Sequence, residues 1–165
     1  MGITIKCETG DDVKLVQNSL DGACLKGLNL HRALLEGQSL QRADLSNAQL
    51  RSAWLEGADL SYAILKDVNL AASNASKAKF CYADLSNAMM RSGIYEKADF
   101  QEATLRGANV GMARFTGANL CGAELLCEGW ETADLSGAVY DGQTIWPSNF
   151  DPTKVDGLVR KDECG

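Results

Sequence analysis

The chain has 165 residues, 45% of them hydrophobic, which is enough for one domain with a real core and argues against disorder. Acidic residues outnumber basic residues by 22 to 16, which gives a net charge of −6. That balance excludes a general nucleic-acid binder, because such a protein needs a basic surface to neutralise phosphates. No apolar run approaches the roughly 18 residues that a transmembrane helix requires. We therefore expect no direct contact with nucleic acid or membrane and a cytoplasmic location, with a removed targeting peptide as the open alternative.

Residues 1–17 lack the periodicity that begins after them. They contain apolar residues at irregular spacing, namely Ile3, Ile5, Val13 and Val16. We predict that this segment is an N-terminal cap, which covers the first coil of a repeat domain that follows it.

Residues 18–145 follow a strict period of five. Every residue whose number is a multiple of five, from Leu20 to Ile145, is apolar, and 16 of these 26 residues are leucine. The residue two places earlier is alanine at 18 of the 24 positions from Ala23 to Ala138. A helix buries residues at a period of 3.6 and a strand at a period of 2, so neither element explains the pattern. The register runs unbroken through the segment, so we expect no inserted loop.

The repeated unit is alanine, then aspartate or asparagine, then leucine, then two variable residues. Clear copies begin at Ala43, Ala58, Ala83 and Ala133. This unit resembles the pentapeptide-repeat family over about four fifths of the chain. The resemblance implies an all-β fold, a right-handed quadrilateral parallel β-helix of about six to seven coils, stacked ~4.8 Å apart. The leucines would fill the tube, and the alanines would point inward near its corners.

Residues 146–165 end the repeat. They begin with the segment Trp-Pro-Ser-Asn-Phe-Asp-Pro at 146–152, which resembles the C-terminal ends of bacterial, especially cyanobacterial, family members. We predict a C-terminal cap and tail here, because an uncapped coil would expose an open β edge and favour end-to-end association. The oligomeric state stays open, with an end-to-end or C-terminal dimer among the alternatives.

Four repeats per coil place residues 20 apart above one another, so the surface can be sorted into columns. One face then carries an apolar column and an acidic column, composed of Leu34, Trp54 and Ile94 beside Glu36, Glu56 and Glu96. Exposed apolar clusters mark interaction sites in many proteins. We predict that these six residues form a protein-binding patch.

Other columns offer an alternative surface and a structural feature. The alternative is a basic stripe on the preceding face, composed of His31, Arg32, Arg51 and Arg91. On a further face, Tyr62 is expected to stack on Tyr82 beside Arg42, which ladder stacking explains without a ligand.

Catalytic and metal-binding patterns are missing from the sequence. The only histidine, His31, has no serine or cysteine nucleophile near it in the column map. The recurring aspartates, such as Asp44 and Asp84, are explained by tight turns. No phosphate-binding loop or metal-ligand spacing occurs. We therefore expect no catalytic residue, no cofactor and no metal, and a protein that is not an enzyme.

The cysteines number six and are Cys7, Cys24, Cys81, Cys121, Cys127 and Cys164. Cys81 and Cys121 share a column two coils apart, which is ~9.6 Å at the usual strand spacing. A disulfide needs Cα atoms within ~7 Å of each other. We therefore expect all of the cysteines to be reduced, as in a reducing cytosol.

Two hypotheses of function follow. The first is a non-enzymatic solenoid scaffold that binds a protein partner through one flat face. The second comes from the family resemblance: some members mimic DNA and bind DNA gyrase or topoisomerase, conferring quinolone resistance. The modest charge of −6 and the lack of an inserted loop favour the first hypothesis.

Overall fold

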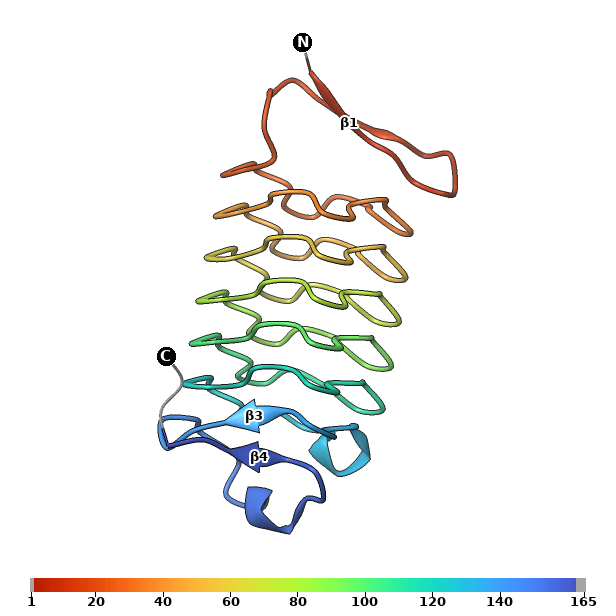
Figure 1. Cartoon of the computed structure of the whole chain (residues 1–165). Helices are drawn as coiled ribbons and strands as arrows, with labels where there is room; N and C mark the ends of the chain where they lie inside the picture. Colours follow the sequence, from red (N-terminus) through yellow and green to blue (C-terminus); the bar gives the residue numbers. More distant parts are fainter. Residues whose placement is uncertain (1, 163–165) are drawn as a thin grey trace.

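The computed structural model describes residues 2–162 and consists of coils stacked into a rod (Figure 1). Isolated parallel bridges recur every five residues and join residues 20 apart, from Cys24↔Asp44 to Asn119↔Val139 with one exception described below. Backbone hydrogen bonds connect the coils at each bridge, as from Leu65 N to Asp84 O at 2.7 Å. The stacking of residues 20 apart, on which the column map depends, is therefore confirmed.

Each repeat turns through a corner with one residue in the left-handed region. Glycine or asparagine suits such a corner, as at Gly57 with φ 67° and Asn47 with φ 60°. Aspartates stabilise the corners that follow them in the chain. Asp44 Oδ1 accepts hydrogen bonds from the Ser46 hydroxyl at 2.6 Å and the Ser46 backbone N–H at 3.0 Å. These bonds hold the pKa of Asp44 below its usual value, which confirms the turn-forming role of this aspartate.

The inward residues form one continuous core. Every predicted inward residue at a multiple of five is buried except Ile145. Leucines fill the N-terminal half, whereas aromatic rings fill much of the C-terminal half. Phe80 stacks on Phe100 with ring centroids 4.7 Å apart, and Tyr95 stacks on Phe115 at 5.1 Å.

The N-terminal segment is an antiparallel hairpin of β1 (Ile3–Ile5) and β2 (Val13–Leu15). An antiparallel bridge between Cys7 and Ala33 joins it to the first coil, and Ile5 is buried. The expectation that Val16 covers the coil is wrong, because its side chain is fully exposed. Val13 and Leu15 alternate toward the core as strand residues do, so Val16 points away from it.

The repeat changes register near its C-terminal end. The bridge Asn109↔Glu128 joins residues 19 apart, whereas the next bridge, Arg114↔Asp134, again joins residues 20 apart. The prediction of an unbroken register is therefore wrong. In the unshifted register the Glu128 carboxylate would face the tube, which is unfavourable for an unpaired charge. The slip buries Cys127 in its place, and a 3-10 turn, η1 (Trp130–Thr132), restores the spacing.

A second change of register follows at the end of the repeat. Ile145 bridges Glu124, 21 residues earlier, and its side chain is 51% exposed. Trp146 packs inward instead, with its ring 5.3 Å from that of Trp130 and 5.7 Å from that of Tyr140. The predicted inward position of Ile145 is wrong because the larger apolar ring of Trp146 covers the end of the tube.

The chain beyond the repeat packs back onto the last coil. The parallel pair of β3 (Val139–Tyr140) and β4 (Val159–Arg160) extends the Asn119 column by one strand. Between them lies a second 3-10 turn, η2 (Pro152–Lys154), whose preceding Asp151 accepts the Thr153 N–H at 3.1 Å. None of the helices in residues 2–162 is long and apolar enough to cross a membrane.

The cysteines differ from the expectation in one respect. Cys7, Cys24, Cys81 and Cys127 are free thiols, whereas Cys121 is disulfide-bonded. Cys164 lies outside the described residues. The prediction of fully reduced cysteines is therefore wrong for Cys121. The distance of ~9.6 Å excludes only a bridge between Cys81 and Cys121, and it sets no limit on other partners of Cys121.

Alkylation of the denatured protein without reductant checks this assignment. We expect mass spectrometry to find the four free thiols labelled and Cys121 unlabelled. A second alkylation after reduction should label Cys121 as well. Labelling of Cys121 before reduction would contradict the disulfide.

Candidate protein-binding face

The apolar column of the predicted patch lies on consecutive coils. Successive bridges join Leu34 to Trp54, Trp54 to Asn74 and Asn74 to Ile94. Leu34 and Trp54 are each 39% exposed, and Ile94 is half-buried. The structure thus brings the three apolar residues of the patch into one column, in which Asn74 forms a low point between the larger side chains of Trp54 and Ile94.

The acidic column beside it is largely neutralised. Glu56 Oε1 lies 2.9 Å from Lys77 Nζ, and Glu96 Oε1 lies 2.7 Å from Arg114 Nη2. Glu36 forms no ion pair within residues 2–162. Lys77 and Arg114 were not predicted as partners, although the column map places both about one coil after the glutamates that they neutralise.

A groove runs beside the apolar column and has a volume of about 410 Å³. Trp54, Ala72, Asn74 and Ile94 are among the residues that line it. At its N-terminal end Arg32 Nη2 lies 2.7 Å from Glu8 Oε2, so an ion pair from the cap closes that end. Glu8 could not be predicted as part of this groove, because the cap lies outside the repeat and the period does not determine the path of the cap.

The basic stripe is less available than the sequence indicates. Arg32 is committed to Glu8, and Arg91 Nη2 lies 3.3 Å from Met112 Sδ. On the further face, the predicted tyrosine ladder is confirmed. The rings of Tyr62 and Tyr82 are parallel within 4° with centroids 5.0 Å apart, and the Arg42 guanidinium lies 5.5 Å from the Tyr62 ring centre.

The thiols of the coils are not poised for nucleophilic chemistry. Burial raises the pKa of the Cys81 thiol to about 11 and that of Cys127 to about 12, so both are neutral near pH 7. Among residues 2–162, no group of three or more histidine, cysteine, aspartate and glutamate side chains could hold a metal ion.

The bridged coils define the chain as a β-solenoid. The family model described as pentapeptide repeats matches in 8 copies, over residues 29–67, 63–92 and 98–126, which is more than half of the chain. The chain belongs to the pentapeptide repeat family, whose fold is the right-handed β-helix expected from the sequence.

Solved structures of the same family are similar to this chain. A pentapeptide repeat protein of the Arabidopsis thaliana thylakoid lumen is 30% identical over 61% of this chain and 70% of its own, with a TM-score of 0.60. One from the cyanobacterium Nostoc is 33% identical over 62% of this chain and 84% of its own, with a TM-score of 0.51.

A more distant structure shares the fold alone. A trypsin-treated form of QnrB1, a plasmid-mediated fluoroquinolone resistance protein, is 18% identical over 78% of this chain and 77% of its own, with a TM-score of 0.51. A search of curated protein sequences found no match.

Proposed function

We propose that this protein is a non-enzymatic scaffold, a right-handed quadrilateral β-helix of six to seven coils that binds a protein partner through the face around Trp54. The observation that carries the proposal is the groove of about 410 Å³ between Trp54 and Ile94. A large aromatic side chain held on a rigid coil loses little conformational entropy on binding, as interface hot spots do.

The contacts on this face define the partner's chemistry. An apolar side chain of the partner fits above Asn74, where it is flanked by Trp54 and Ile94. Because Glu56 and Glu96 are already paired, Glu36 is the carboxylate of this column left to meet a basic group beside it. The patch thus suits an apolar anchor with a neighbouring positive charge.

The triple variant Trp54→Ala, Glu36→Lys, Glu56→Lys tests the proposal. All three side chains are exposed, so we expect the melting temperature to change by only a few degrees. We expect recovery of the physiological partner in affinity capture from native cells to fall at least about tenfold, the effect of roughly 1.4 kcal/mol.

A matched variant on other columns serves as the control. Tyr82→Ala, Asp67→Lys, Glu102→Lys also removes one exposed aromatic ring and reverses two charges. It should recover the same proteins as the parent chain. A captured set that is unchanged by the Trp54 variant, or equally reduced by both variants, would rule out the Trp54 face as the binding surface.

The alternative function is DNA mimicry, with gyrase or topoisomerase as the partner. The similarity to QnrB1 shows the fold alone, and two of the three glutamates on the candidate face are neutralised by Lys77 and Arg114. These observations favour the scaffold. A supercoiling assay with purified gyrase separates the two: inhibition or relief that weakens at high salt would support mimicry, and no effect at micromolar protein would remove it.

The compartment bears on which partners are accessible. The sequence predicts the cytoplasm, whereas the Cys121 disulfide favours an oxidising compartment. The similar Arabidopsis protein comes from the thylakoid lumen. Alkylation of the protein in its native cells, before lysis, decides between the two: a protected Cys121 favours the oxidising compartment.

A further inference from the structure

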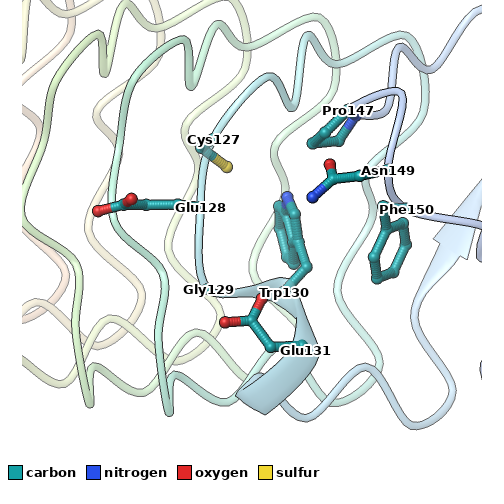
Figure 2. Close-up of a pocket in the computed structure, with 8 residues that line it drawn as sticks. All are labelled: Cys127, Glu128, Gly129, Trp130, Glu131, Pro147, Asn149 and Phe150. Atoms are coloured by element: carbon teal, nitrogen blue, oxygen red, sulfur yellow. The ribbon is translucent and has the colours of Figure 1, made fainter.

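A second pocket, separate from the Trp54 face, opens at the C-terminal end of the rod and has a volume of about 470 Å³. Figure 2 shows its two sides. The last coil contributes Cys127, Gly129 and Trp130, and the C-terminal cap contributes Pro147, Asn149 and Phe150. The pocket lies where the repeat slips in register, and departures from a regular pattern concentrate at functional sites.

The slip itself creates the opening. Gly129 has φ 97°, and η1 carries the chain outward at the corner before the regular spacing returns. The cap then crosses the end of the coil through Pro147 instead of forming another bridged coil. No bridge extends the Glu128 column beyond Glu128 within the described residues.

This leaves an unpaired strand edge in the pocket. One coil earlier, Ala108 O accepts the Glu128 N–H at 3.0 Å and Val110 N–H donates to Glu128 O at 2.9 Å. Cys127 and Gly129 flank Glu128 in the last coil as Ala108 and Val110 flank Asn109 one coil earlier. Within residues 2–162, Cys127 O accepts no backbone hydrogen bond and Gly129 N–H donates none. Such an edge accepts an added strand from another chain.

The charges at the rim of the pocket determine which kind of partner strand can bind there. Glu128 and Glu131 both line the pocket and are exposed. Glu128 turns toward the preceding coil, where Oε1 accepts the Asn109 side-chain N–H at 2.9 Å, and Glu131 forms no ion pair in the described part of the chain. The Asn149 amide points toward the Trp130 ring and supplies a further donor and acceptor (Figure 2). The rim therefore favours positive charge.

We propose that this pocket binds an extended, basic segment of a partner protein. The segment's backbone N–H and C=O pair with Cys127 O and Gly129 N–H, as another coil would. Its arginine or lysine side chains meet Glu128 and Glu131. This site is independent of the Trp54 face, so either surface can fail its test without affecting the other.

A fluorescein-labelled hexapeptide of alternating threonine and arginine is the probe, measured by fluorescence anisotropy and by amide NMR on the full chain. We expect saturable binding, with shifts of the Gly129 backbone amide and the Asn149 side-chain amide. The double variant Glu128→Gln, Glu131→Gln should weaken binding about tenfold, as the loss of two exposed ion pairs would. Glutamine at 128 keeps an acceptor for Asn109. A peptide with N-methylated backbone amides and the same charge should bind more weakly than the parent peptide.

The matched control is Asp67→Asn, Glu102→Gln, which removes the same charge from two exposed residues outside both proposed sites. It should leave the affinity for the hexapeptide unchanged. The proposal is overturned if both double variants weaken binding equally, if the N-methylated peptide binds as well as the parent, if the shifts fall on other residues, or if no binding occurs at millimolar peptide.

Discussion

Leu65→Arg is expected to unfold the protein at temperatures where the parent chain is fully folded. Leu65 is completely buried, and the residues above and below it in its column, Leu45 and Leu85, are buried as well. An arginine there places an unpaired charge in an apolar tube, which costs several kcal/mol. A domain has about 5–15 kcal/mol of stability in total. Thermal melting followed by circular dichroism should therefore show no cooperative transition, or one displaced far downward.

Lys66→Ala is the control, one residue later and on the outside. It removes an exposed ion pair between Lys66 Nζ and Asp84 Oδ2 at 3.2 Å, which is worth at most about 1 kcal/mol. Its melting temperature should fall by a few degrees at most. If the two variants melt alike, the assignment of inward and outward positions in this coil is wrong.

Gly129→Ala should cause the second large loss of stability. Its φ of 97° costs an alanine about 1–2 kcal/mol. The new Cβ would also lie 2.4 Å from Gly111 N and 2.6 Å from Gly111 Cα, and neither atom can rotate away. We expect a loss of about 3 kcal/mol or more in the free energy of unfolding, measured in urea.

Gly57→Ala separates the two causes. Gly57 also has positive φ, 67°, but a Cβ there meets nothing within 4 Å. This variant should lose only the conformational part, about 1 kcal/mol. Equal losses in the free energy of unfolding for the two variants would mean that the contact of a Cβ at position 129 with Gly111 costs no stability.

The columns could be predicted because the period and the coil length together fix which residues meet. The pairing of Tyr62 with Tyr82 follows from that spacing alone, and so does the alignment of Leu34 with Trp54. The ion pairs that neutralise the glutamates of this face could not be predicted from the spacing. A pair such as Glu56 with Lys77 depends on how far the two side chains reach between neighbouring coils. Glu8 at the end of the groove depends on the cap, whose path no repeat specifies.

Some departures from the repeat are explained by side-chain contacts in the structure. Gly93 stands where alanine is usual, and Tyr95 stands where leucine is usual. A Cβ on Gly93 would lie 2.6 Å from Tyr95 Cε2 and 2.7 Å from its hydroxyl oxygen. The two departures therefore have one cause, the extra volume of a buried tyrosine in a tightly packed tube. Their proximity in sequence made this pairing predictable in principle.

The change of register at Glu128 has a signal in the sequence. A glutamate at an inward alanine position would be a buried charge without a partner, which is unfavourable. A change of register at this point keeps the carboxylate out of the tube. Cys127 is small and apolar enough to take the place one residue earlier. The direction of the slip depends on Gly129 lying against Gly111, a contact between coils that the local sequence does not display.

Bridges between residues 20 apart also govern how a chain of this kind can change length. Duplicating one whole coil would lengthen the rod by ~4.8 Å and leave every later residue on its own side. Duplicating a single repeat would instead turn all later residues by one side and carry Ile94 off the side that presents Trp54. A gene for such a protein can therefore grow or shrink by whole coils without remodelling its surfaces, whereas any other increment rebuilds each side downstream of the change.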